Sequence, residues 1–148
     1  MALETEAIGA AVEYVAKKER SEAEVRRHLA SKGFCPESIE AAIDRLRQRG
    51  FVDDRRVAGR LANGSSLIGP NKIRAKLAGR GVGDAEIDAA VASIDEAGQR
   101  SAIATLLDKR GFGTADRVKA YRFLIARGFE EALVQSELES KWGSFDAE

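Results

Sequence analysis

The sequence repeats one short pattern around three glycines, Gly33, Gly81 and Gly128, which are 48 and 47 residues apart. Each glycine has a leucine four residues before it, a basic residue directly before it, and Phe or Val directly after it. Branched apolar residues follow six and ten places later, at Ile39 and Ile43, Ile87 and Val91, and Val134 and Leu138. A period in this range is typical of helical repeats, so each stretch is expected to fold into the same small unit.

Each repeated glycine predicts the end of one helix and the approach to the next, because glycine adopts the left-handed cap conformation at least cost. Helix starts are predicted by a capping box at Ser21-Glu22-Ala23-Glu24, by Pro36 and Pro70 in first turns, and by Asp84 as a cap. A further helix precedes each pair, at residues 4–18, 54–62 and 97–109. The apolar residues at helical spacing there include Ile8, Val12 and Val15, and Ile103, Leu106 and Leu107.

The pattern therefore predicts an all-α chain of three tandem three-helix modules, with limits at 1–52, 53–94 and 95–148. Two prolines and 6% aromatic residues also favour helices over strands. Since a module this small hides little apolar surface alone, the modules are expected to stack into an elongated, curved array. Trp142 and Phe145 are expected to pack onto the third module.

The formal net charge is zero, but the charges are unevenly distributed. Between Arg55 and Gly83 there are seven basic residues and no acidic one, which makes the second module basic. Lys72, Lys76 and Arg80 are spaced by four, which places them on one helical stripe. Such a stripe either binds phosphates or acidic side chains of a partner, or is a solvated helix face, and the sequence leaves both interpretations open.

Other basic residues occupy matching positions in the repeat. Arg26 and Arg74 both stand seven residues before their glycines, Arg27 stands six before, and Arg127 directly precedes Gly128. Basic residues at helix ends also favour the helix dipole, so Arg80 and Arg127 have a structural interpretation as well. The candidate residues for binding a partner or DNA are Arg26, Arg27, Arg55, Arg56, Arg60, Lys72, Arg74, Lys76, Arg80 and Arg127.

The sequence predicts no enzyme, no metal site and no cofactor. Cys35 and His28 are the single cysteine and histidine, so neither a disulfide within the chain nor a zinc site of these residues is expected. The acidic pair Asp53 and Asp54 is interpreted as a helix cap, and Gly79 to Gly83 lacks the spacing of a phosphate loop. Without a run of 18 apolar residues, we expect a cytoplasmic monomer with no membrane association.

Three stretches together resemble the RecX family of recombination regulators. They are the junction Phe51-Val52-Asp53-Asp54-Arg55-Arg56-Val57-Ala58, Lys72-Ile73-Arg74-Ala75-Lys76-Leu77 followed by Arg80-Gly81-Val82, and Ser21-Glu22-Ala23-Glu24-Val25-Arg26-Arg27-His28-Leu29. The resemblance covers roughly residues 8–140. It implies a regulator of homologous recombination, DNA repair and the SOS response, which lies in the groove of the RecA filament on single-stranded DNA. It also implies that the chain restrains the ATPase and strand exchange of RecA without being an enzyme.

Two alternatives remain open on sequence grounds. Three-helix units resemble helix-turn-helix domains, which would make the chain a stand-alone DNA-binding regulator. The zero net charge argues against this alternative. So does the acidic helix expected from Asp84 to Ile94, because a recognition helix in the major groove normally offers basic or amide side chains to the base edges. The other alternative is a helical adaptor for a different protein. Whether single-stranded or duplex DNA is contacted directly is likewise left open.

Overall fold

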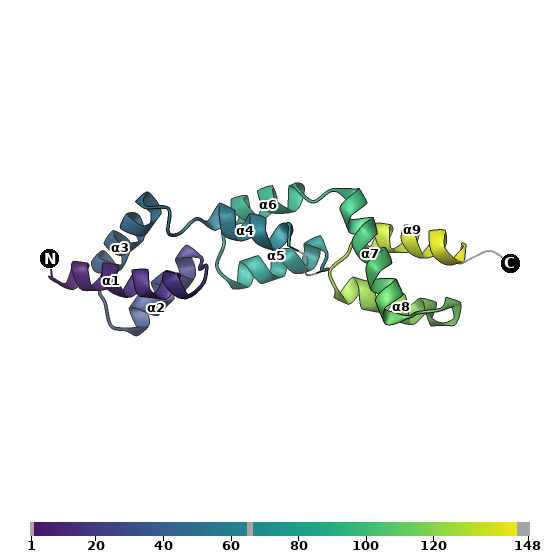
Figure 1. Ribbon diagram of the computed structural model, residues 1–148, viewed down its shortest axis with the longest axis horizontal. Coiled ribbons are helices and arrows are strands. Elements are labelled where there is room, and N and C mark those ends of the chain that lie inside the picture. The colour runs from purple at the N-terminus through teal and green to yellow at the C-terminus, as the bar shows by residue number, and fades with distance from the viewer. Residues whose placement is uncertain (1, 65–66, 145–148) are drawn as a thin grey trace. The chain divides into compact units, whose positions relative to one another are not determined.

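The computed structural model describes residues 2–64 and 67–144, and this part of the chain is helical without any strand (Figure 1). The all-α prediction is confirmed. The described elements are α1 Ala2–Lys17, α2 Glu22–Ser31, α3 Pro36–Gln48, α4 Asp54–Ala62, α5 Pro70–Gly79, α6 Asp84–Ala92, α7 Glu96–Arg110, the 3-10 helix Thr114–Asp116, α8 Arg117–Ala126 and α9 Glu131–Trp142.

The chain forms two compact units. The first contains the residues up to Arg60 together with Leu77–Asp88, and the second contains Leu61–Lys76 together with the described residues from Ala89 onward. The predicted module 1–52 falls within the first unit and the module 95–148 within the second, while residues of 53–94 belong to both. The three module limits and the curved array stay predictions.

The repeated glycines end helices α2, α5 and α8 in the same way. Gly33, Gly81 and Gly128 have φ angles of +90°, +80° and +95°. In each case the glycine N–H and the following N–H donate to carbonyls three and five residues back, as Phe34 does to Leu29. This is the Schellman motif. In this motif the residue after the glycine also packs against the leucine that lies four residues before the glycine. The repeated sequence pattern is thus the signature of one helix end formed three times.

A fourth helix end of this kind was not predicted. At the end of α3, Gly50 has a φ of +73° and donates to Arg47, while the Phe51 N–H donates to the Leu46 carbonyl at 2.8 Å. The signal was present in the sequence, since Leu46, Gly50 and Phe51 have the spacing of the other three.

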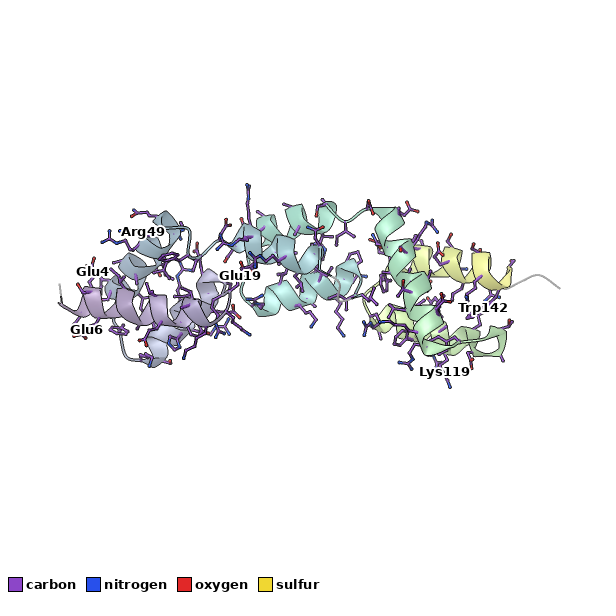
Figure 2. All side chains as sticks on the ribbon, viewed as in Figure 1. Glu4, Glu6, Glu19, Arg49, Lys119 and Trp142 are labelled. Carbon is purple, nitrogen blue, oxygen red and sulfur yellow. The ribbon has the colours of Figure 1, made fainter. Side chains whose placement is uncertain are left out.

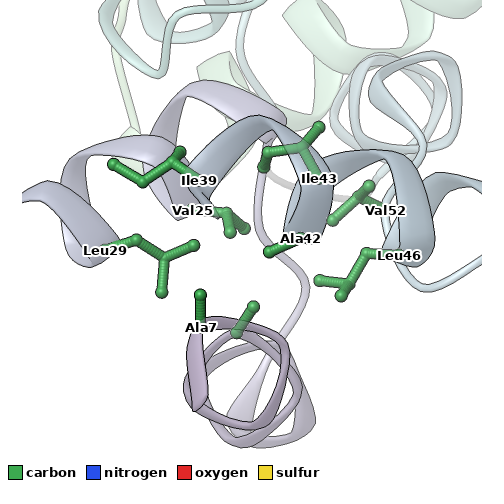
Figure 3. Close-up of a cluster of buried hydrophobic side chains, with 9 residues drawn as sticks. Ala7, Val25, Leu29, Ile39, Ala42, Ile43, Leu46 and Val52 are labelled. Carbon is green, nitrogen blue, oxygen red and sulfur yellow. The ribbon is translucent and has the colours of Figure 1, made fainter. Parts of the chain in front are cut away.

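A core of α1, α2 and α3 fills the first unit, and Figure 3 shows its buried side chains. Leu29, Ile39 and Ile43 are buried as predicted. The prediction for α1 was partly wrong, because Ala7 and Ala11 are fully buried whereas Val12 is 37% exposed. Alanines let α1 approach its neighbours closely, and this turns its larger side chains toward the edge of the core. The members of the core are Ala7, Ala11, Val25, Leu29, Ile39, Ala42, Ile43, Leu46 and Val52.

The core of the second unit lies among α7, α8 and α9. The predicted residues Ile103, Leu106 and Leu107 are all buried there, together with Phe129, Leu124 and Val134. Trp142 packs against this core as expected, and Phe145 lies outside the described residues.

Candidate partner-binding surface

The stretch from Arg55 to Gly83 contains no acidic residue, but acidic side chains from elsewhere in the chain contact it in the fold. Glu19, labelled in Figure 2, lies between α1 and α2, and its Oε2 is 2.9 Å from Arg56 Nε and 3.7 Å from Arg60 Nε. Arg56 also donates to the Gly50 carbonyl at 3.1 Å. Both arginines therefore join α4 to the segment between α1 and α2, and Arg56 also joins it to the end of α3; their charge is partly neutralised within the first unit.

Arg80 is the third member of the run with an acidic partner. Its guanidinium donates to both carboxylate oxygens of Glu24 at 2.9 and 3.2 Å and to the Glu19 carbonyl at 3.2 Å. Burial raises the pKa of Glu24, but hydrogen bonds from Arg80 and Ser21 outweigh it, and the pKa lies below its usual value. The Ser21 hydroxyl in turn donates to the Arg80 carbonyl at 2.5 Å. Arg80 thus anchors the end of α5 to the start of α2.

Arg127 has the equivalent place in the second unit. It donates to the Leu67 carbonyl at 2.8 Å, and its own carbonyl accepts from the Gly69 N–H at 2.8 Å. The Gly128 carbonyl accepts from the Asn71 N–H at 2.9 Å. The C-terminal carbonyls of α8 thereby satisfy N–H groups at the N-terminus of α5, where both would otherwise lack partners. The structural interpretation of Arg80 and Arg127 as residues of helix ends accounts for these contacts.

Arg26 is also engaged by acidic residues. It makes a bidentate pair with Glu40 at 2.7 and 3.1 Å and a longer one with Glu22 at 3.5 Å. Glu22 further pairs with Arg47 at 2.8 Å, and the hydrogen bond from Arg47 is the main cause that lowers the pKa of Glu22. These pairs link α2 to α3 on the surface of the first unit.

Six candidate residues are exposed, in two different units. Arg27, Arg55 and Arg60 belong to the first unit. Lys72, Arg74 and Lys76 are exposed on α5 in the second, where Ile73 is buried. Lys72 and Lys76 are one helical turn apart, as the predicted stripe requires, whereas Arg80 follows the end of α5 and turns to Glu24. We define the basic face of α5 as Lys72 and Lys76; Arg74, two residues from each, points to a different side of the helix.

Two clusters of aromatic and cationic side chains were not predicted from the sequence. In the first unit, the rings of Tyr14 and His28 stack at 3.9 Å, and Arg20 lies 4.0 Å from the centre of the Tyr14 ring. In the second, Arg110 lies 4.4 Å from the centre of the Phe123 ring. No single motif marks such clusters, because the partners lie far apart in the sequence.

The acidic pair after Val52 has the capping role that was predicted. Asp53 Oδ1 accepts from the backbone N–H groups of Arg55 and Arg56 at 3.0 and 3.2 Å, at the start of α4. Asp54 Oδ1 accepts from the Glu22 N–H at 3.0 Å, and burial raises the pKa of Asp54.

The described residues contain no group of three His, Cys, Asp or Glu side chains that could hold a metal ion. Among the helices that the structure describes, none is long and apolar enough to cross a membrane.

Comparison with known proteins places this chain beside one family. A family model described as the first three-helix domain of RecX matches residues 7–54. Regulatory protein RecX of Chromohalobacter salexigens is 31% identical over 140 residues, which cover 89% of this chain and 90% of the relative. Regulatory protein RecX of Thermus thermophilus is 35% identical over 126 residues, 84% of each chain.

Solved structures agree in fold. The crystal structure of RecX from Lactobacillus salivarius superposes with a TM-score of 0.84 at 20% identity, covering 93% of this chain and 96% of the other. A second crystal structure, of regulatory protein RecX, gives a TM-score of 0.81 at 22% identity over 93% of this chain and 73% of the other.

Proposed function

This chain belongs to the RecX family of regulatory proteins, and we propose on that basis that it binds the RecA filament on single-stranded DNA. In this proposal it lies in the filament groove and restrains ATP hydrolysis and strand exchange by RecA. Its role is regulatory rather than catalytic, and it acts as a cytoplasmic monomer. The observation that carries the proposal is the basic face of α5 in a chain whose overall charge is zero.

The basic face of α5 supports binding to an anionic surface for a physical reason. Lys72, Arg74 and Lys76 are exposed on one short helix, in a run without acidic residues. A surface that serves solubility alone normally mixes both signs of charge. Arg80 and Arg127 are excluded from the proposed contact surface, because they hold helix ends together.

A chain of repeated modules is suited to bind a filament that is itself built of repeated protomers. If several modules each contact a protomer of the filament, the second contact forms at a high effective concentration, and affinity rises without a tight individual contact. Bridging adjacent protomers in this way would oppose the changes that accompany hydrolysis and extension of the filament.

The sharpest test reverses two charges of α5 and spares Arg80. The double variant Lys72→Glu and Lys76→Glu should bind the filament at least about tenfold more weakly, since two attractive contacts become repulsive. Its helicity should remain that of the parent, because both side chains are exposed. Reversal of Arg80 would be uninformative, since a glutamate there would face Glu24 and destabilise the first unit.

A matched control has the same change in net charge at exposed lysines outside α5. The double variant Lys18→Glu and Lys109→Glu serves this purpose, since both lysines are exposed. Equal losses of filament affinity in the two double variants would show that net charge alone matters, and would remove α5 as the binding face.

A further inference from the structure

Three side chains of the first unit form a column of stacked planar groups. Arg20 lies 4.0 Å from the centre of the Tyr14 ring, and the His28 ring lies 3.9 Å from it with an angle of 5° between the planes. Two groups this close to one ring centre must occupy its opposite faces. Tyr14 is therefore enclosed on both sides, while the imidazole has only one face against Tyr14 and its side chain is partly exposed.

The column is surrounded by positive charge. Lys17 at the end of α1 and Lys32 after α2 are exposed. Burial lowers the pKa of His28, and the charges of Lys32, Arg20 and Lys17 lower it further. Of the acidic groups near the column in sequence, Glu24 is bound by Arg80 and Glu19 by Arg56, while Glu13 is exposed next to Tyr14 and four residues before Lys17. The cationic charge at the column is thus not neutralised by Glu19 and Glu24.

Arg20 itself lacks the usual polar partner. Its Nε atom is buried and has no hydrogen-bond acceptor among the described residues. The guanidinium lies over the Tyr14 ring, which supplies no anion. A cation–π contact does not neutralise the cation, so the charge stays available to an anionic ligand.

The second unit also contains a contact between cations and an aromatic ring. Tyr14 is seven residues after the buried Ala7, and Arg110 is seven after the buried Ile103. His28 and Phe123 each stand five residues before a repeated glycine. There Arg110 lies 4.4 Å and Arg127 5.7 Å from the centre of the Phe123 ring.

We propose that the column Arg20–Tyr14–His28, with Lys17 and Lys32, is a binding site for single-stranded nucleic acid. A base stacks on the open face of the His28 imidazole, and the adjoining phosphates contact the two lysines. Flat stacking platforms flanked by cations are the means by which proteins hold single strands without reading their sequence. A duplex conceals the faces of its bases, so it lacks the stacking contact. The inference goes beyond the proposed function and does not depend on it, because the strand needs no other protein.

The single histidine of the chain makes the test specific to this site. The pKa of His28 is measured by NMR from its ring protons, with and without a saturating oligothymidylate of about twelve nucleotides. We expect the pKa to rise on binding, because the phosphates offset the charges of Lys17, Arg20 and Lys32. By linkage, the affinity should then increase as the pH falls, tenfold for each unit by which the strand raises the pKa.

Neighbouring lysines provide a matched pair of variants. Lys17→Gln and Lys32→Gln should each weaken binding and lower the slope of log affinity against log salt concentration by about 0.7. Lys18→Gln removes the same charge one residue away, but Lys18 is not among the cations that shift His28. It should therefore leave the affinity nearly unchanged. Circular dichroism of each variant checks that the helices are intact.

Several results would overturn the proposal. One is the absence of oligonucleotide binding, and another is a His28 pKa that does not change at saturation. Equal weakening by Lys17→Gln and Lys18→Gln would show an unspecific attraction to charge. Binding of a duplex of the same length with equal affinity would show that the imidazole does not serve as a stacking platform. None of these results bears on binding to the RecA filament, which is tested separately on α5.

Discussion

The glycine at each repeated helix end experiences a different environment. A Cβ atom at Gly128 would lie 2.4 Å from the backbone nitrogen of Lys72 and 2.9 Å from its Cα, whereas nothing lies within 4 Å of a Cβ at Gly33. Both glycines have a left-handed backbone, with φ angles of +95° and +90°. Gly33 is therefore required for its conformation alone, and Gly128 for its conformation and for space.

This difference predicts the cost of two substitutions. Gly33→Ala should lower the free energy of unfolding by about 1 kcal/mol, the usual cost of a left-handed non-glycine residue. Gly128→Ala should lower it by more than about 3 kcal/mol, since the backbone of Lys72 must move as well. Urea denaturation of the two variants measures both costs. Equal costs would mean that the close approach of Gly128 to α5 is absent in solution.

The Glu24–Arg80 pair predicts a pH dependence of stability. The pKa of Glu24 is lowered in the folded chain, so the pair contributes stability that is present above the ordinary value of 4.5. This contribution is lost as the pH falls through the lowered value. Between pH 6 and pH 3, the free energy of unfolding of the variant Glu24→Gln should therefore fall by about 1 kcal/mol less than that of the parent. Parallel acid denaturation curves for parent and variant would contradict this role.

At the scale of the helices, α1 is the element whose buried face differs most from the prediction. Its apolar residues Ile8, Val12 and Val15 lie near the edge, and Ala7 and Ala11 face the core. Helical periodicity weighs large apolar side chains above alanine, so the sequence alone favoured the wrong face. What decides the matter is the close approach of α1 to the rest of its unit, which only small side chains permit.

The corrected face of α1 predicts opposite responses to substitution. Ala11→Leu should destabilise the first unit by about 2 kcal/mol, because three additional carbons must fit into a filled core. Val12→Ala should cost less than about 1 kcal/mol, since Val12 is already 37% exposed. Thermal unfolding of the two variants provides the comparison, and a larger loss for Val12→Ala would restore the original prediction.

Helix limits were largely predictable because they depend on neighbours in the sequence. Ser21 and Glu24 form the capping box that the sequence indicated, and Pro36 and Pro70 begin α3 and α5. Gly33, Gly81 and Gly128 adopt the expected left-handed conformation. Each of these features is decided within about five residues, which is the range over which local hydrogen bonds form.

At the scale of the whole chain, the candidate surface was less predictable than the fold. Arg56, Arg60 and Arg80 stand in a stretch of the sequence without acidic residues, since no Asp or Glu occurs between residues 55 and 83. The fold brings Glu19 and Glu24 to them from 37 to 56 residues away. Sequence position carries no information about such distant pairs, and so only the structure shows which of these arginines are paired within the chain.

The proposal that this chain restrains RecA is tested by one titration. The hydrolysis of ATP by RecA on single-stranded DNA is followed as this protein is added, with its binding to the bare strand recorded in parallel. We expect inhibition at concentrations where the bare strand is still unoccupied, and weaker inhibition by the variant Lys72→Glu with Lys76→Glu. Unchanged hydrolysis up to concentrations that saturate the bare strand would contradict it, and would favour a stand-alone DNA-binding regulator.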